Sequence, residues 1–282
     1  MQAVLDREEF IEQAHLFRAL SLRSHGAEPA QELLRSVREE ILSTTKLPMA
    51  IDYLLAELNH VGTMSTAMRR MTHYFTPFQT FLVEQAESDR SRFDMTRAFM
   101  ILESEANFRA NLSKLPAFFF FQFEVLCRNR LPYDKGLEAM ASDPIFDEVW
   151  QQWMMGVRHK IGLVELADLV YVHSDYYVIR SQQDGSDAIR PVPILFGEKE
   201  GRIALANRRK EPLYFFSALQ RQLNYPAVPK QEIKDPAEDL LPKLAKQIEK
   251  MEVRIKLLED EQREKGIDLE KFFKRPDSPS ID

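Results

Sequence analysis

The sequence predicts a mainly α-helical protein, on the evidence of its composition and of the spacing of its apolar residues. Its 282 residues contain nine glycines, about half the usual share of roughly 7%, so tight hairpins and glycine-rich loops are scarce. Leu, Ala, Glu, Arg and Gln favour helices and are abundant here. Apolar residues also recur every three or four positions. We expect an N-terminal antiparallel bundle, a mostly helical middle region with possible short β-strands, and a C-terminal amphipathic coiled-coil helix.

The chain divides into four predicted parts. Residues 1–112 are the helical bundle, and residues 113–230 are a mostly helical, aromatic-rich domain. Residues 231–275 combine a proline-spaced linker with the coiled-coil helix, and residues 276–282 are expected to be a disordered tail. In the third part, six apolar residues alternate at three- and four-residue spacing, which is the a/d pattern of a coiled coil: Leu241, Leu244, Ile248, Met251, Ile255 and Leu258. This helix is expected to form a homodimer; docking on its own domain is the alternative.

The first part contains five long predicted helices and one short one. They cover residues 5–22, the stretches that begin near Pro29 and Pro48, the short segment STAMRRM, and the stretches from Pro77 and Asp94. Thr76 and Gln79 match a capping box, in which each side chain binds the backbone amide of the other residue. Asp94 is the expected N-cap of the last helix. The short connections indicate antiparallel neighbours.

The middle part is less regular. Asp143 and Pro144 are expected to cap a helix that carries both tryptophans. Residues 164–180 fit a helix or a buried strand, and their length favours a helix. The best candidates for short strands are residues 191–197 (PVPILFG) and 201–207 (GRIALAN). Residues 211–223 predict another helix.

Several functional classes are disfavoured by composition. A net charge of −6 and a pI near 5.7 give no reason to expect nucleic acid as a partner. The lone cysteine, Cys127, excludes an internal disulfide and a multi-cysteine zinc site, and an inert buried thiol is expected there. The longest apolar run, residues 117–127, is shorter than the about 20 residues that span a membrane, and no signal peptide is visible. We expect a soluble, cytoplasmic protein with no transmembrane segment.

Paired Glu-x-x-His motifs raise the question of a metal site. Glu12 and His15 form one motif, and Glu57 and His60 form the other, as in di-metal carboxylate bundles. All four side chains lie roughly 110° or more from the centre of the apolar stripe of their helix. Ligands in a bundle must point inward, so we expect no metal. Phosphate-loop and nucleophile motifs are also absent from the sequence, and we expect no cofactor and no catalytic residue.

Residues 9–109 resemble the cytoplasmic helical domain of the inner-membrane platform proteins of type II secretion and type IV pili (the F family). The resemblance consists of FIEQAHLFRAL, the stretch GTMSTAMRRM that Gly62 opens and that contains the short helix, the break HYFTPF, and TFLVEQAE with Glu87. FMILESEA fits the closing helix of that domain. This sequence departs from the family pattern at Ala86, where the family has glycine, and in lacking the membrane helix that follows the domain.

The resemblance implies a non-catalytic domain that binds other proteins, such as a secretion or pilus ATPase or a platform subunit. We therefore expect a scaffold or adaptor, with Arg69, Arg70, Glu84, Glu87 and Arg90 as outward-facing contact residues. Reversal of the charges at Glu87 and Arg90 is expected to abolish binding without lowering the melting temperature.

The alternative function is an enzyme or small-ligand-binding protein with a pocket in the aromatic-rich middle region. Its proposed lining is Tyr171, Tyr176, Tyr177, Phe215 and Phe216. Either His159 or His173 is the candidate acid–base group. Ordinary core packing is the competing interpretation of these aromatic residues.

Overall fold

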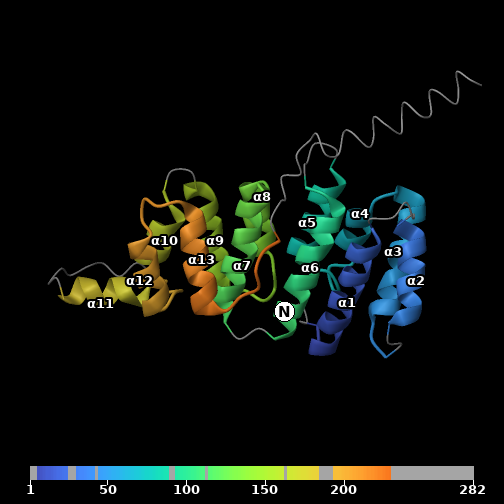
Figure 1. Ribbon diagram of the computed structural model, residues 1–282, viewed down its shortest axis with the longest axis horizontal. Helices are drawn as coiled ribbons and strands as arrows, with labels where there is room; N and C mark the ends of the chain where they lie inside the picture. Colours follow the sequence, from blue (N-terminus) through green and yellow to red (C-terminus); the bar gives the residue numbers. More distant parts are fainter. Residues whose placement is uncertain are drawn as a thin grey trace, which may run out of the picture. The chain divides into compact units, whose positions relative to one another are not determined.

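The computed structural model describes residues 5–24, 30–41, 44–88, 93–111, 114–161, 164–183 and 193–229 (Figure 1). Within these ranges the chain forms thirteen α-helices and no β-strand, which confirms the prediction of a mainly α-helical protein. None of the helices in these ranges combines the length and the apolar character needed to cross a membrane. The predicted coiled-coil helix, with its six apolar seam residues, and the predicted tail lie outside the described residues.

Helices from the first two predicted parts belong to one compact unit, which extends to Gln231. The helices of the first part are α1 (Arg7–Arg23), α2 (Ala30–Glu40), α3 (Leu47–Val61), α4 (Met64–Arg70), α5 (Pro77–Glu87) and α6 (Met95–Ala110). Those of the middle part are α7 (Leu115–Arg128), α8 (Tyr133–Ala141), α9 (Glu148–Lys160), α10 (Leu166–Val172), α11 (Asp175–Gln183), α12 (Glu198–Ala206) and α13 (Pro212–Leu223).

Local capping signals place the starts of α5 and α6 where the sequence predicts them. The Gln79 amide donates to Thr76 Oγ1 at 3.2 Å, and the Thr76 amide donates to Gln79 Oε1 at 3.1 Å, which is the predicted capping box. The Asp94 carboxylate accepts the Arg97 amide at 2.8 Å. These bonds satisfy amides that the first turn of a helix leaves unpaired.

Helices α1 and α6 pack side by side and run antiparallel (Figure 1). Ser24, after the end of α1, lies 2.8 Å from the hydroxyl of Thr96 at the start of α6. At the other end, Arg7 of α1 donates to Asn111, just past α6, at 3.2 Å. The two bonds join opposite ends of the two helices, so the two chain directions are opposed.

The prediction of a strand at residues 201–207 is wrong, because residues 201–206 belong to helix α12 and Asn207 is its C-cap. Alternating apolar residues there are too few to exclude a helix, and Glu, Lys, Ala and Leu favour one. Gly201 lies against the start of α11: a Cβ atom at Gly201 would come within 2.1 Å of Ser174 Oγ, just before this helix, and within 2.8 Å of Tyr176 Cβ. The segment 191–197 forms no strand in its described residues, and Phe196 makes an isolated bridge with Ser174.

The predicted cap of the tryptophan-containing helix is also wrong. Helix α9 begins at Glu148, and the Asp147 carboxylate accepts the Trp150 amide at 2.9 Å. Asp143, the predicted cap, is fully buried and binds Arg109. Residues 164–180, predicted as one helix, form the two helices α10 and α11, with Ser174 between them.

Helix α7 forms the centre of the aromatic core. Phe118, Phe119, Phe120 and Phe121 are all fully buried. The Phe119 ring lies with its centroid 5.0 to 6.2 Å from the rings of five neighbours, Phe120, Phe123, Trp150, Trp153 and Phe196. Edge-to-face and tilted contacts at such distances stabilise aromatic clusters beyond simple burial.

The thiol of Cys127 is expected to be unreactive in the folded protein. Burial raises its pKa to about 12, and the thiolate is the form that attacks alkylating reagents. At pH 7.5 we expect iodoacetamide to modify Cys127 at least about 100-fold more slowly than an ordinary exposed cysteine. Mass spectrometry of the folded and the urea-unfolded chain measures this, and rapid modification of the folded chain would contradict it.

A buried ionic cluster joins helix α6 to the connection between α8 and α9. The Arg109 guanidinium donates to Glu105 Oε1 at 3.1 Å and to Asp143 Oδ1 at 3.0 Å. It also lies over the ring of Phe118, with its Cζ atom 4.6 Å from the ring centroid. Burial lowers the pKa of Arg109, but the two carboxylates outweigh this effect and hold it above its usual range.

Hydrogen bonds extend this cluster into the first part of the chain. Gln79 donates to Glu105 at 2.9 Å and to Gln13 at 3.1 Å, and Gln13 donates to the carbonyl of Tyr74 at 3.1 Å. The Tyr74 hydroxyl donates to Glu9 at 3.0 Å. Each of these buried side chains thus has a partner, as a low-dielectric interior requires.

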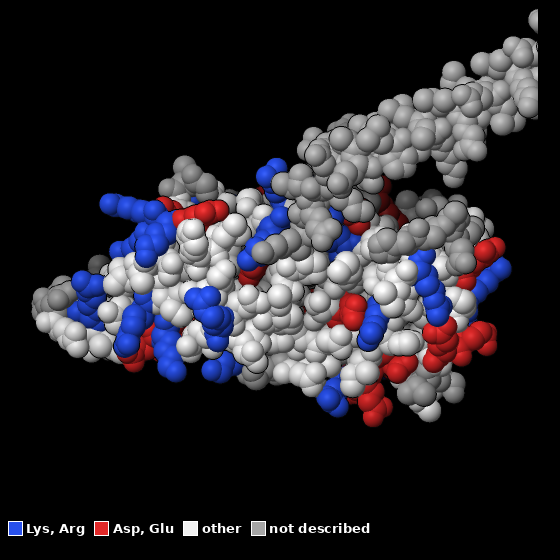
Figure 2. All heavy atoms as spheres, viewed as in Figure 1, with Lys and Arg blue, Asp and Glu red and all other residues white. Residues whose placement is uncertain are grey.

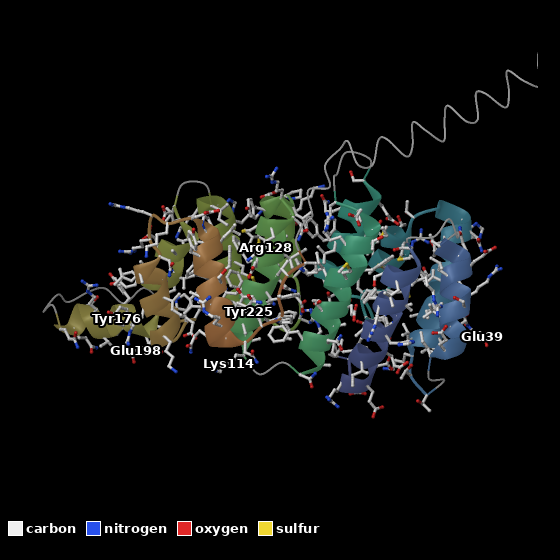
Figure 3. All side chains as sticks on the ribbon, in the orientation of Figure 1. Glu39, Lys114, Arg128, Tyr176, Glu198 and Tyr225 are labelled. Atoms are coloured by element: carbon white, nitrogen blue, oxygen red, sulfur yellow. The ribbon has the colours of Figure 1, made fainter. Side chains whose placement is uncertain are left out.

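A second buried group of polar residues connects α7 to the segment after α13. Glu124 is almost fully buried and forms an ion pair with Arg128. Arg128 and Tyr225 are labelled in Figure 3. The Tyr225 hydroxyl lies 2.7 Å from the Glu124 carboxylate and 3.1 Å from the carbonyl of Phe216. Burial is the main cause that raises the pKa of Tyr225 above its usual range, and the negative charge of Glu124 raises it further. The ionic cluster around Arg109 and the polar residues around Glu124 thus both connect the aromatic core to the surrounding helices.

Candidate protein interface

A carboxylate at the end of α5 joins this helix to α4, the short helix that follows α3. Gly62 ends α3 with a φ of 77°, a left-handed conformation that favours glycine. Helix α4 then begins without a side-chain cap from its own N-cap residue. Glu87 supplies the acceptors instead: its carboxylate binds the amides of Met64 and Ser65 and the hydroxyl of Ser65. A negative charge at this position also complements the helix dipole.

Glu87 therefore has a structural role that the sequence analysis did not predict. Its side chain is half-buried and faces α4. A charge reversal at this residue changes stability as well as surface charge. We expected charge reversal at Glu87 and Arg90 to leave the melting temperature unchanged. For Glu87 this expectation is corrected, because its reversal removes the cap of α4. Arg90 lies outside the described residues.

We expect Glu87→Ala to lower the free energy of unfolding by about 1 kcal/mol or somewhat more, as the loss of a helix cap does. Urea unfolding followed by circular dichroism measures the change. Glu84→Ala is the matched control, because Glu84 is also a glutamate of α5 but makes an exposed ion pair, and such pairs contribute little. Equal stability of the two variants would contradict the capping role.

Two predicted contact residues, Arg69 and Glu84, bind each other on the surface of α4 and α5. Arg69 Nη2 lies 2.6 Å from Glu84 Oε2, and both side chains are exposed, at 60% and 41%. Arg70 is exposed as well and lies 2.8 Å from Glu57 of α3. A hydrogen bond with Tyr53 and the charge of Glu57 raise the pKa of Arg70. The structure thus brings three of the five predicted residues to the solvent on adjoining helices.

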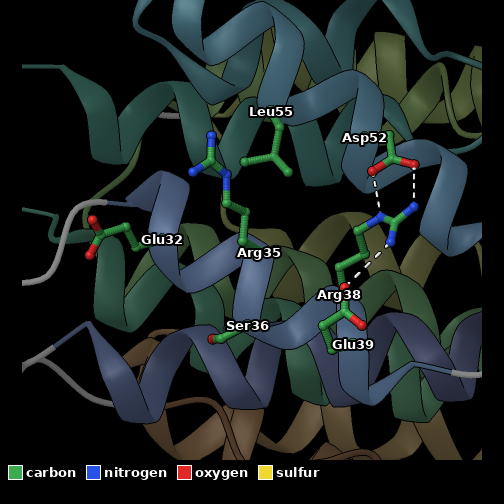
Figure 4. Close-up of a pocket in the computed structure, with 7 residues that line it drawn as sticks. All are labelled: Glu32, Arg35, Ser36, Arg38, Glu39, Asp52 and Leu55. Atoms are coloured by element: carbon green, nitrogen blue, oxygen red, sulfur yellow. Dashed lines mark hydrogen bonds and ion pairs between the residues drawn. The ribbon is translucent and has the colours of Figure 1, made fainter.

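Charges of both signs alternate over the part of the surface formed by α1 to α6 (Figure 2). An open groove of about 620 Å³ lies between α2 and α3 on this part (Figure 4). In it Arg38 binds Asp52 at 2.9 Å, and Arg35 points toward Leu55. Five of the seven lining residues are charged: Glu32, Arg35, Arg38, Glu39 and Asp52. This shallow, charged lining suits contact with another macromolecule better than enclosure of a small substrate.

The residues of the two Glu-x-x-His motifs do not meet. His15 is exposed and lies 3.7 Å from Glu40 of α2, whereas Glu57 binds Arg70 and His60 is exposed on α3. Across the described ranges, no group of three or more His, Cys, Asp or Glu residues is placed to hold a metal ion.

The five aromatic residues of the alternative pocket belong to two sets of contacts. Tyr171 packs against Tyr176 and Tyr177, with centroid distances of 6.3 and 5.3 Å. Phe215 packs instead against Phe120, and Phe216 against Phe123, in the aromatic core.

The two candidate acid–base histidines also differ in their surroundings. His159 is exposed at the end of α9. His173 is half-buried, and its Nδ1 lies 2.8 Å from the carbonyl of Pro193. Burial lowers the pKa of His173, the hydrogen bond with Pro193 partly opposes this effect, and the charge of Lys160 adds to it. Because a carbonyl oxygen can only accept, His173 donates to it from Nδ1.

Residues on the outer face of α3 form a feature that the sequence analysis missed. The apolar periodicity of this helix predicts an inner stripe, of which Ile51, Leu54 and Leu58 are buried. Met49 and Tyr53 are exposed, at 71% and 36%. The available signal was the presence of large apolar residues outside the inner stripe, because the outer face of a surface helix is normally polar.

No protein-family model matches the chain, and neither the curated proteins nor the solved structures contain a significant match. The resemblance of residues 9–109 to the secretion platform domain therefore stays a prediction.

Proposed function

We propose that this protein is a non-catalytic helical adaptor that binds another protein through a surface formed by α4 and α5, centred on Arg69 and Glu84. The observation that carries the proposal is the Glu87 carboxylate, which fixes α4 to α5. A short, seven-residue helix gains little stability by itself. Fixed in this way, it holds Arg69 beside Glu84 in one defined position.

The charges of this surface are better suited to recognition than to stability. Exposed ion pairs contribute at most about 1 kcal/mol to folding, so Arg69 and Glu84 are free to change without loss of the fold. Charged groups at the rim of an interface steer the encounter and select the partner. A protein with complementary charges is the partner this surface fits.

The proposal extends to cellular context through the family resemblance. The segments that carry it, from Gly62 to Glu87, are those that form α4, α5 and their connections. By analogy with the platform proteins, the partner is a secretion or pilus ATPase or a platform subunit, and the setting is the cytoplasm. The C-terminal heptad pattern makes a homodimer part of the same proposal.

Affinity purification of the tagged full-length chain from its native host tests this function. We expect one protein to co-purify in a fixed ratio, and an ATPase or platform subunit would support the link to secretion. A version that ends before Pro236 is the control for contacts of the coiled-coil helix. Recovery of the chain alone, under gentle conditions, would contradict the adaptor function.

A further inference from the structure

Helix α3 carries exposed apolar side chains on its outer face as well as buried ones on its inner face. Among its 15 residues the strongly polar ones are Asp52, Glu57, Asn59 and His60. The core contacts of the helix are made by Leu47, Ala50, Ile51, Leu54 and Leu58, which are buried. The outer face of a surface helix is normally polar, so exposed apolar side chains on that face suggest a contact surface.

The outer stripe consists of Met49, Tyr53 and Ala56, followed by His60. At about 100° per residue these four lie within roughly 60° of one another around the helix. Met49 is the most exposed large hydrophobic side chain in the described ranges, and Ala56 and His60 are exposed too. The stripe thus occupies the centre of the face that points away from the core.

Ion pairs border this outer stripe on both sides. On one side Arg38 of α2 binds Asp52 at 2.9 Å, and on the other Arg70 of α4 binds Glu57 at 2.8 Å. An apolar centre with a polar rim is the usual anatomy of a protein interface. Because each carboxylate is neutralised by an arginine of its own chain, no net charge opposes the approach of an identical face.

We propose that the outer stripe of α3 binds the α3 helix of a second copy of this chain about a two-fold axis. In an antiparallel pair centred between Leu54 and Leu55, Tyr53 faces the partner's Ala56. Met49 faces the partner's His60. A large side chain then opposes a small one, which fills the interface, and both copies use the same residues, as two-fold dimers require.

This contact is separate from the proposed coiled-coil seam. Two different two-fold interfaces in one chain link the copies into a closed tetramer or an extended chain. Either arrangement would repeat the α4–α5 surface at fixed intervals. Such repetition raises the avidity for a partner that is itself an oligomer.

Light scattering coupled to gel filtration tests the inference on the full-length chain. Ile248→Glu first disables the predicted coiled-coil seam. This variant is expected to remain a dimer of the 32.9 kDa chain, and the addition of Ala56→Glu is expected to halve its mass. Ala206→Glu, the same change at an exposed alanine of α12, is the matched control and is expected to leave the mass unchanged.

Two outcomes would overturn the inference: a monomeric Ile248→Glu chain, or a mass that Ala56→Glu does not change. A monomeric Ile248→Glu chain would be consistent with a dimer formed by the coiled coil alone. After either outcome, the partner of α3 would instead be an unrelated protein or the chain's own C-terminal helix. Circular dichroism checks that the variants fold. Met49→Lys replaces Ala56→Glu if that variant unfolds. Met49 is 71% exposed, so a charge there does not disturb the core.

Discussion

Replacement of Arg109 by leucine is expected to lower the free energy of unfolding by about 3–5 kcal/mol. The Arg109 side chain is 2% exposed, and the side chains of Glu105 and Asp143 are fully buried. The substitution leaves two carboxylates buried without their cation. Water cannot solvate them, and the apolar side chain offers no hydrogen bond.

Urea unfolding at pH 7 measures this loss. Arg202→Leu is the matched control, since Arg202 also pairs with a glutamate at helical spacing but is 65% exposed. Exposed substitutions of this kind change stability by about 0.5 kcal/mol or less. A loss at Arg109 as small as that at Arg202 would show that the buried cluster does not hold α6 to the α8–α9 connection.

The second large effect is expected at Phe119, where substitution by alanine should cost about 3–5 kcal/mol. The ring is fully buried in α7 and contacts five other aromatic rings, so its removal leaves a cavity that the surrounding helices can fill only in part. Phe119→Leu keeps most of the volume and is expected to cost clearly less.

Tyr214→Ala is the control for this core substitution, because Tyr214 is an aromatic residue on α13 with 63% of its surface exposed. Thermal and urea unfolding of the three variants should rank them Tyr214→Ala, Phe119→Leu and Phe119→Ala, from the smallest to the largest loss. Equal losses at Phe119 and Tyr214 would contradict the central place of α7 in the core.

Local signals in the sequence were sufficient for much of the helical architecture. The Thr76 capping box depends on residues within one turn, so its prediction does not require knowledge of the tertiary structure. The same is true of Asp94. Periodic apolar residues placed both ends of α1, and the starts of α2 and α3, to within a few residues of those observed.

The errors arose where distant residues decide between local alternatives. Asp143 and Asp147 both suit a helix N-cap, and the contact of Asp143 with Arg109, 34 positions earlier, leaves Asp147 as the cap. Helix α8 was not predicted, and its Gly136 disfavours a helix. The glycine allows close packing, because a Cβ atom there would meet Leu126 of α7 at 2.6 Å.

The candidate interface was predictable in part. Helix periodicity placed Arg69, Arg70 and Glu84 outward, and the structure exposes all three to some extent. The role of Glu87 depends on the position of α4 relative to the end of α5, which the periodicity of one helix does not contain. The same limit applies to the ion pairs that border the outer stripe of α3.

A charge swap at Arg69 and Glu84 tests the proposed partner surface most directly. The double variant Arg69→Glu, Glu84→Arg keeps an ion pair between α4 and α5 and inverts the charges that a partner meets. Arg202→Glu, Glu198→Arg is the matched swap on α12. We expect the first swap to weaken binding of the co-purified partner at least about tenfold, which corresponds to about 1.4 kcal/mol, with unchanged stability. Undiminished binding by this variant, at the level of the α12 swap, would contradict the account.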